Sequence, residues 1–422
     1  MDNEITTIER NDTWELTDLP KGHKTIGVKW VYKTKLKENE EVDKYKACLV
    51  AKGYKQKFAF LQGDLQELVF VDQPPYIKLG NEHKVYKLKK ALYGLKQAPR
   101  AWYSCIDAYF FKEGFRRCLH EHTLFIKIEN GGKMFFVCLY VDYLIYTGND
   151  RAMFENFKKS MMSEFEMSDL GMLHYFLGIE VVQSATGIFI SQKKYVREIL
   201  DRSQIKNCNS VNTPTEFGLK LNKDHEGKKV DGTLYKQIMG SLMYLTARRP
   251  NIMYSVSLIS RYMENPTEMY LLAAKRILQY LQGTKEFGLF YKKGEKSNLI
   301  GFTDSDYVGD QDDRKSTSGY VFILGSGAIS WSSKKQSIVT LSTAEAEFVA
   351  ASSCTCQAIW LKRILEELHF KRQEPTAIFC DNTSAIKLSK NPVLHGRSKH
   401  LDVNLYKSSS LLNKYRQLLS PI

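Results

Sequence analysis

The chain has 422 residues and a mass of 48.7 kDa, a length that predicts two or three domains. Hydrophobic residues make up 43% of it and charged residues 26%, which excludes a wholly disordered or collagen-like chain. With 61 Lys and Arg residues against 47 Asp and Glu residues, the formal net charge is +14, as is typical of proteins that bind polyanions. Many basic proteins bind nothing acidic, so charge alone leaves a nucleic-acid partner open.

Cysteine spacing and apolar segments predict an intracellular protein without a membrane anchor. The eight cysteines are scattered, and the closest pair, Cys354 and Cys356, has no second pair at zinc-binding spacing. The polar start MDNEITTIERNDTWEL lacks the apolar core of a signal peptide. The most apolar run, 134–146, contains Asp142 and is shorter than the roughly 18 residues that span a bilayer.

The first half of the chain reads mainly as strands. Residues 24–36 alternate apolar and polar side chains, and 45–54 are expected to return as an antiparallel partner. Residues 84–103 mix Lys and Arg with Tyr and Trp, which suits phosphates and stacked bases; the alternative is an amphipathic helix with solvated lysines. Residues 133–148 predict an apolar hairpin with Asp142 near its tip.

The second half changes character twice. From 196 to about 290, apolar residues recur at spacings of three and four, which predicts connecting helices. From Leu299 onward, strand-like segments at 299–304, 320–324 and 328–332 precede a long helix and another strand at 376–381. Strands followed by alternating helix and strand indicate a separate α/β domain.

Several carboxylates in this last domain are candidates for chemistry. Asp304 and Asp381 each end a predicted strand, so they meet if those strands are neighbours. Ser342 and Glu345 fit the capping box of a helix start, which makes Glu345 structural. Glu347 lies on another face of that helix and is expected to point inward, where a carboxylate needs a metal or a cation.

Asp402 follows the basic stretch HGRSKH and by itself is most simply a surface residue. Together with the other acids it would add a hard oxygen ligand of the kind that suits Mg²⁺. Two such ions a few ångströms apart stabilise the attacking and leaving oxygens of in-line phosphoryl transfer.

A series of ordered segments carries a resemblance that covers nearly the whole chain. It resembles the reverse transcriptase and ribonuclease H portion of a Ty1/copia-type retrotransposon Pol polyprotein. The matching segments are NDTWEL, VKWVYKTK, FLQGDLQELVFVDQPP, VYKLKKALYGLKQAPRAWY, LHYFLGIEV, GSLMYLTARRP, AAKRILQYLQGT, DRKSTSGYVF, ISWSSKKQ, TAEAEF, CDNTSAI and SKHLDV.

The resemblance implies an α/β (α+β) chain with a truncated right-hand polymerase, a helical thumb and connection, and a C-terminal ribonuclease H-like domain with a mixed sheet. The implied divisions are a lead-in at 1–23, truncated fingers and palm at 24–195, thumb and connection at 196–298, the ribonuclease H-like domain at 299–410 and a divergent tail at 411–422.

The polymerase positions depart from the family pattern. The family holds its metals with three aspartates, one on an early palm strand and two adjacent at a YVDD hairpin tip. Here the tip reads YVDY, so Asp142 remains, but Tyr143 replaces the second carboxylate with a phenol that cannot bind Mg²⁺ at neutral pH.

The early palm strand departs further. Between Gln56 and Phe58 the family has a few dozen residues that end in a QLDV-like strand, and they are missing here. Asp64 corresponds to the loop after that strand and is not expected to substitute. Cys48 stands where the family usually has an Arg that meets the triphosphate. RNA-directed DNA polymerase activity is therefore expected to be absent.

The nuclease positions match instead. By the resemblance, Asp304, Glu347, Asp381 and Asp402 are catalytic metal ligands for two Mg²⁺ ions, with Mn²⁺ as a substitute, that cleave RNA in an RNA/DNA hybrid. After KHLDV the chain departs from the family's RYHFIRE-like helix, so the residues that follow Asp402 differ from those of the family.

The resemblance also implies contacts with a primer-template or hybrid. Gln97 would lie near the nucleotide pocket, and residues 174–176 would form the primer-gripping turn. The alternative is a catalytically inactive retroelement remnant that at most binds nucleic acid, with these positions ordinary core and surface residues. The nucleic-acid-binding candidates are Lys87, Lys89, Lys90, Gln97, Arg100, His174, Tyr175 and Phe176.

Overall fold

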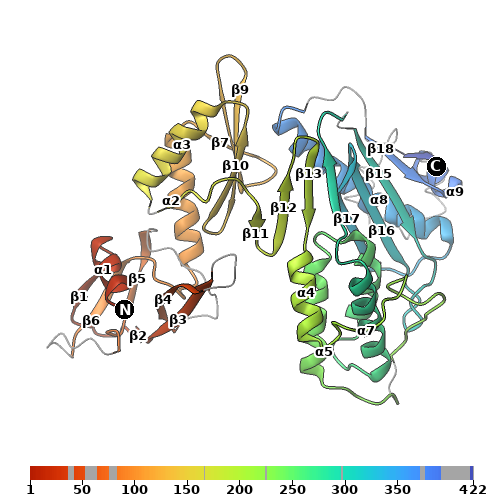
Figure 1. The fold of residues 1–422 in the computed structure, drawn as a ribbon, viewed down its shortest axis with the longest axis horizontal. Helices are drawn as coiled ribbons and strands as arrows, with labels where there is room; N and C mark the ends of the chain where they lie inside the picture. The colour runs from red at the N-terminus through yellow and green to blue at the C-terminus, as the bar shows by residue number, and fades with distance from the viewer. Residues whose placement is uncertain are drawn as a thin grey trace. The chain divides into compact units, whose positions relative to one another are not determined.

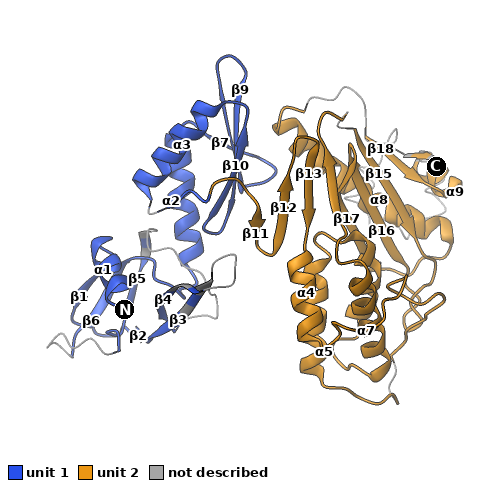
Figure 2. Ribbon diagram, in the orientation of Figure 1, with its two compact units in different colours: residues 1–170 blue, residues 171–422 orange. Residues whose placement is uncertain are grey.

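The computed structural model describes residues 1–36, 42–52, 64–75, 83–165, 167–223, 226–295, 298–370, 376–390 and 419–421. The chain divides into two compact units, residues 1–170 and 171–422 (Figure 2). Both units combine helices with sheets, as Figure 1 shows, which confirms the expected mixed α/β class.

Unit 1 contains a small sheet, a separate hairpin and a larger sheet with two helices. Its elements are α1 (Asp2–Arg10), β1 (Trp14–Thr17), β2 (Thr25–Ile26), β3 (Val28–Leu36), β4 (Val42–Ala51), β5 (Asp64–Val71), β6 (Val85–Lys90), α2 (Ala98–Lys112), β7 (Arg116–Arg117), β8 (Leu124–Glu129), β9 (Lys133–Tyr140), β10 (Tyr143–Gly148) and α3 (Arg151–Glu164).

The predicted first strand pair is confirmed. β3 and β4 pair antiparallel, with Val28 opposite Ala51. A second sheet has the order β1-β6-β5-β2. The helical alternative for the basic segment is wrong over β6, because Tyr86 and Leu88 alternate inward in the period of two that only a strand produces. The helix α2 starts later, with Gln97 as its N-cap and a proline in its first turn.

The larger sheet of unit 1 has the order β10-β9-β8-β7 and is antiparallel. Aromatic side chains of this sheet and of α2 and α3, among them Phe110, Phe135 and Phe157, form its core. β10 is an end strand, and no described strand pairs with its other edge. A strand edge without a partner is a position where a sheet can accept a further strand.

Unit 2 begins with a small sheet and a helical cluster and ends in a five-stranded sheet. Its elements are β11 (Tyr175–Phe176), β12 (Ile179–Gln183), β13 (Gly187–Ser191), α4 (Lys193–Arg202), α5 (Gly232–Leu245), η1 (Pro250–Ile252), α6 (Met253–Ser260), α7 (Glu268–Gly283), β14 (Gly288–Lys292), β15 (Leu299–Ser305), β16 (Thr317–Leu324), β17 (Gly327–Lys335), α8 (Thr343–Glu367), β18 (Ala377–Cys380), α9 (Thr383–Lys390) and β19 (Leu419–Pro421).

The helices expected after residue 196 are confirmed. Residues of α4, α5, α6 and α7 share one core, in which Tyr235, Leu242 and Leu281 are fully buried. Strands β11 to β14 form an antiparallel sheet in sequence order, so that β14, which follows the helices, returns to pair with β13. The helical segment is therefore inserted between two paired strands.

The last sheet has the order β17-β16-β15-β18-β19. Its first three strands are antiparallel, whereas β18 runs parallel to β15 and β19 runs parallel to β18. The helix α8 packs on β15, β16 and β18, so it covers the centre of the sheet (Figure 1). The strands and long helix predicted from Leu299 onward are thus confirmed.

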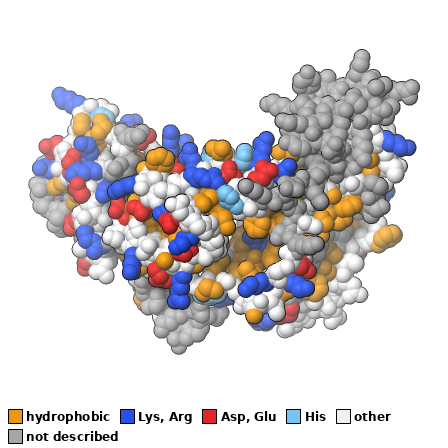
Figure 3. Space-filling view, turned by 90° about the horizontal axis from the view of Figure 1, so that it is seen from above, with side chains coloured by type: hydrophobic (Ala, Val, Ile, Leu, Met, Phe, Trp, Pro, Cys, Tyr) orange, Lys and Arg blue, Asp and Glu red, His pale blue; other side chains and the backbone are white. Residues whose placement is uncertain are grey.

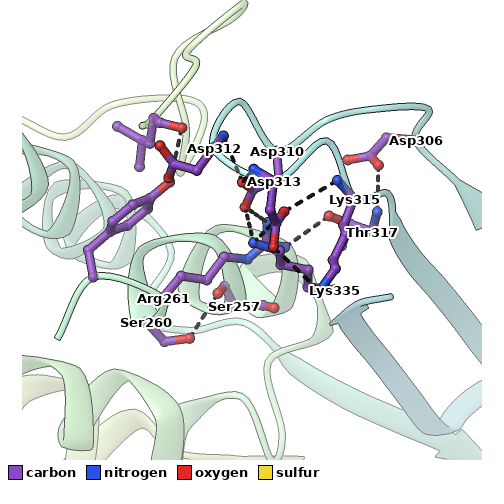
Figure 4. A network of polar contacts seen from close by, with 12 residues as sticks. Ser257, Ser260, Arg261, Asp306, Asp310, Asp312, Asp313, Lys315, Thr317 and Lys335 are labelled. Atoms are coloured by element: carbon purple, nitrogen blue, oxygen red, sulfur yellow. Dashed lines mark hydrogen bonds and ion pairs between the residues drawn. The ribbon is translucent and has the colours of Figure 1, made fainter. Parts of the chain in front are cut away.

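A polar network joins the helical cluster to this sheet (Figure 4). Asp310 is only 2% exposed, and its Oδ2 lies 2.6 Å from Lys335 Nζ and 3.3 Å from Arg261 Nη1. Arg261 follows α6 and also donates to Thr317 Oγ1 at 2.9 Å. Because Thr317 begins β16, the network fixes the loop between β15 and β16 to the end of α6.

Candidate functional site

Two of the predicted acids follow neighbouring strands. β15 and β18 are paired in parallel as far as Phe302 and Phe379, and Asp304 and Asp381 each stand two residues later. The carboxyl ends of parallel strands lie at one edge of a sheet, so both side chains emerge there, and both are exposed. The expectation that these strands are neighbours is confirmed.

The start of α8 brings a third carboxylate to the same edge. Ser342 Oγ accepts from the backbone N–H of Glu345 at 3.2 Å, and a Glu345 oxygen accepts from the N–H of Leu341 at 2.8 Å, so the predicted helix cap is present. Two residues on, Glu347 points inward and is only 5% exposed. Its Oε1 accepts a 3.0 Å hydrogen bond from the backbone N–H of Ser305.

The electrostatics of Glu347 are those of a carboxylate crowded by others. Burial, together with the nearby Asp304 and Asp381 carboxylates, raises its pKa to about 7, and the hydrogen bond from the Ser305 N–H opposes this shift. The Cys380 thiol lies 3.9 Å from Glu347 Oε2, and burial raises the pKa of that thiol to about 11. The thiol is therefore protonated at neutral pH and is a donor to the carboxylate.

The carboxylates of Asp304, Glu347 and Asp381 fit a hard divalent cation. Potential ligand atoms of Glu347, Cys380 and Asp381 all lie within 4.8 Å of one another, and the Glu347 carboxyl, when protonated, donates to Asp304. A divalent cation would offset the mutual repulsion of the carboxylates, whereas the protonated thiol is a poor ligand for Mg²⁺. The sequence analysis did not predict Cys380 as part of this site, although Cys380 directly precedes the predicted ligand Asp381. Asp402 lies outside the described residues.

The hairpin of unit 1 is confirmed, with Val141 and Asp142 in its two-residue turn between the paired Tyr140 and Tyr143. Val141 has a φ of +55°, a left-handed conformation that is rare for a β-branched residue. Its carbonyl accepts a 2.8 Å hydrogen bond from the indole of Trp102 on α2. Asp142 is exposed at the tip.

Cys48 lies on β4 and is buried. Burial raises the pKa of Tyr93, with further contributions from Glu4, Cys48 and Asp142. The Tyr93 carbonyl accepts a 2.6 Å hydrogen bond from the backbone N–H of Ala51, so Tyr93 lies beside β4. A thiol carries no positive charge, so Cys48 provides no cation on β4.

Two of the predicted phosphate-contacting lysines form ion pairs with carboxylates. Lys87 Nζ lies 3.0 Å from Glu15, while Lys89 Nζ lies 3.0 Å from Asp12 and 3.5 Å from Glu15. Lys90 is the last residue of β6. These contacts are solvent-exposed ion pairs of modest strength, which a polyanion can compete for.

Gln97 and Arg100 lie at the start of α2, Gln97 half-buried as the N-cap and Arg100 exposed in the first turn. The predicted primer-gripping residues belong to unit 2. Tyr175 and Phe176 form β11 and pair with β12, and His174 Nδ1 lies 3.0 Å from the Met172 carbonyl. On the face in Figure 3, basic side chains are interspersed with acidic ones rather than gathered in one patch.

Comparison with known proteins places this architecture in a family. The family model described as reverse transcriptase (RNA-dependent DNA polymerase) matches residues 11–59 and 56–217. The chain is 37% identical over 446 residues to the Retrovirus-related Pol polyprotein from transposon RE1 of Arabidopsis thaliana, covering 96% of this chain and 30% of that protein.

Two further relatives extend the comparison. Identity to the Retrovirus-related Pol polyprotein from transposon TNT 1-94 of Nicotiana tabacum is 36% over 454 residues, covering 96% of this chain and 34% of that protein. Identity to a putative transposon Ty5-1 protein of Saccharomyces cerevisiae is 32% over 298 residues, covering 70% of this chain and 96% of that protein.

The chain belongs to the Ty1/copia-type retrotransposon Pol polyprotein family, as the sequence motifs predicted. It spans about a third of the length of the RE1 and TNT 1-94 polyproteins. Within the described part of the chain, no helix has the length and apolar character needed to cross a membrane.

Proposed function

We propose that the ribonuclease H-like domain predicted at 299–410 is a nuclease that cleaves the RNA strand of RNA/DNA hybrids. Three antiparallel strands followed by two parallel ones, with α8 across the sheet, support this assignment. The observation that carries it is the convergence of Asp304, Glu347 and Asp381 at one sheet edge, where the pKa of Glu347 is raised to about 7.

The chemistry proposed for this edge requires divalent cations. When bound, two Mg²⁺ ions supply a polarised water and neutralise charge on the leaving oxygen of the RNA. Asp304, Glu347 and Asp381 would hold them, with Asp402 as the proposed fourth ligand. The Ser305 N–H fixes one oxygen of Glu347, which keeps this carboxylate at the edge of the sheet.

Cleavage of a labelled RNA/DNA hybrid in Mg²⁺ and in Mn²⁺ tests this proposal. Asp381→Asn is expected to abolish cleavage, because it removes an exposed ligand without disturbing a buried contact. Glu345→Gln is the matched control, since Glu345 lies on the same helix but serves the cap. A folded wild-type protein that binds hybrid without cutting it would instead establish the inactive, nucleic-acid-binding remnant.

We also infer that the polymerase activity is lost. The family model matches in two segments that meet at residues 56–59, which supports a missing stretch of family sequence there. The alignments to the RE1 and TNT 1-94 polyproteins extend over 446 and 454 residues, more than the 422 of this chain. Of the three family aspartates, the resemblance leaves Asp142 alone, too little negative charge for two metal ions.

Primer extension on a primed homopolymer, in Mg²⁺ and then in Mn²⁺, tests this loss. No template-dependent incorporation is expected from the wild-type chain. Incorporation that disappears in Asp142→Asn would show that the hairpin still supports catalysis and would refute the proposal. A reverse transcriptase with an intact YVDD hairpin serves as the positive control for the substrate.

Nucleic-acid binding is proposed to involve Lys87, Lys89, Lys90 and Arg100, and Lys87 and Lys89 would exchange their carboxylate partners for phosphates. Each released counterion steepens the dependence of binding on salt. The double change Lys87→Gln and Lys89→Gln is expected to lower the slope of log K against log salt by about 2. An unchanged slope would leave these lysines as partners of Asp12 and Glu15 only.

A further inference from the structure

We propose that Gln336 is a positioning residue of the proposed nuclease site, which it serves by joining the backbone segments that carry Asp304 and Glu347. The inference rests on the proposed ribonuclease function and concerns how the carboxylates are held for a divalent cation. Gln336 directly follows β17 and is not one of the acids of that site.

Gln336 is held firmly in the core. It is only 6% exposed, and its backbone N–H donates to the Ser316 carbonyl at 2.8 Å. Its side-chain Nε2 lies within hydrogen-bonding distance of three oxygens: Ser305 Oγ at 3.1 Å, Ser318 Oγ at 2.9 Å and the Ala346 carbonyl at 2.9 Å. One amide nitrogen thus contacts β15, β16 and α8.

Two of these contacts are one residue away from a carboxylate of the site. Ser305 follows Asp304, and its N–H binds Glu347 Oε1 at 3.0 Å. Ala346 precedes Glu347 on α8. Gln336 therefore bridges the residue after one acid and the residue before another, and so adds a second polar link between β15 and α8 beside the bond from the Ser305 N–H to Glu347. Metal sites depend on such outer contacts, because they orient the ligands.

Stability alone does not favour glutamine at this position. Its Oε1 is buried and finds no hydrogen-bond donor among the described residues. A buried acceptor without a donor destabilises a fold, and an apolar side chain of the same shape would avoid that cost. The donor side of the amide is what the site uses, and methionine removes it while preserving length and volume.

The test compares Gln336→Met with Gln357→Met in the full chain. Gln357 is the matched control, because it lies on α8 and donates to Ser330 Oγ on β17 at 3.0 Å, but lies ten residues, about 15 Å, along the helix from Glu347. Mn²⁺ binding is measured by electron paramagnetic resonance. The Mg²⁺ dependence of Tm and of hybrid cleavage is measured in parallel.

Gln336→Met is expected to weaken Mn²⁺ binding at least about tenfold and to shift both Mg²⁺ responses to higher concentration by the same factor. Gln357→Met is expected to leave all three unchanged, whatever it does to Tm in EDTA. If Gln336→Met lowers Tm in EDTA but binds Mn²⁺ like wild type, Gln336 is merely structural and the proposal is overturned.

Ser305→Ala provides a second variant, because it removes the Oγ contact of Gln336 and keeps the backbone N–H that binds Glu347. A smaller shift in the same direction is expected, and wild-type Mn²⁺ affinity in both variants would overturn the positioning role. A wild-type protein that binds no Mn²⁺ and shows no Mg²⁺ response would overturn the proposed nuclease itself. This result differs from one in which the wild type binds Mn²⁺ and both variants bind it equally well, which would overturn only the role of Gln336.

Discussion

The indole Nε1 of Trp102 donates a 2.8 Å hydrogen bond to the carbonyl of Val141, the residue before Asp142 at the tip of the β9–β10 hairpin. Trp102 is 3% exposed and packs edge-to-face on Phe165 at 5.4 Å. The bond satisfies a carbonyl in a turn whose φ of +55° is unfavourable for valine. The conformation of the tip therefore depends on α2 as well as on the turn itself.

Trp102→Phe is expected to lower the free energy of unfolding by about 2 kcal/mol, because it removes this bond and leaves a small void. Urea unfolding followed by far-ultraviolet circular dichroism measures the change. Phe111→Leu is the control on the same helix, since Phe111 is 81% exposed, and it is expected to change stability by less than about 0.5 kcal/mol. Equal effects of the two variants would contradict the bracing role of Trp102.

Tyr143→Asp recreates the YVDD tip but is not expected to restore primer extension. By the resemblance the first family aspartate is missing, so the proposed ligand set would have two of its three carboxylates. Measurement is by template-dependent nucleotide incorporation in Mg²⁺ and in Mn²⁺. Incorporation by Tyr143→Asp above the level of wild type would show that the second tip carboxylate alone limits this polymerase.

Asp310 predicts a pH dependence of stability. Burial alone would raise its pKa, but hydrogen bonds from Lys335 and from the backbone N–H groups of Asp313 and Asp312 outweigh burial and hold the pKa at about 2. Because the pKa is depressed on folding, its stabilisation is complete above the unfolded value of 3.8 and is lost as the pH falls toward about 2.

Asp310→Asn is therefore expected to lower the free energy of unfolding by about 2 kcal/mol at pH 6. The difference from wild type is expected to shrink between pH 4 and about 2. Urea midpoints of both proteins across this range measure it. Asp313→Asn is the control, because Asp313 is more exposed and its ion pairs with Lys315 and Lys335 are accordingly weaker. If the difference between the two proteins does not change with pH, ionisation of Asp310 is not its cause.

Glu347→Gln is expected to stabilise the metal-free protein at pH 8. The folded pKa of about 7 lies above the ordinary 4.5, so ionisation of Glu347 lowers stability as the pH rises through that interval. Removing this charge raises the free energy of unfolding by at most about 3 kcal/mol, and this stabilisation vanishes below pH 4. Thermal unfolding in EDTA measures it, while hybrid cleavage is expected to be lost. No gain at pH 8 would contradict the crowding of carboxylates.

Local patterns in the sequence were sufficient for most elements. Alternation of side chains predicted β3, β4 and the β9–β10 hairpin, and the spacing of three and four predicted α4 to α7. The sequence around Lys87 was compatible with either a strand or a helix, since aromatic and basic residues fit either pattern over so few positions. In the structure this segment is a strand, because β6 pairs with β1 on one side and β5 on the other. A strand in the middle of a sheet has hydrogen-bond partners for its backbone groups on both sides.

The order of residues by itself determined which family this chain belongs to, which acids it retains and that Glu347 turns inward, because composition, period and motif are local properties. Only the tertiary structure decided that Asp304 and Asp381 emerge at one edge, that Cys380 joins them, and that Gln336 touches the neighbours of two of these acids. Such proximities arise from parallel strand pairing and helix packing between distant segments, which local spacing does not encode.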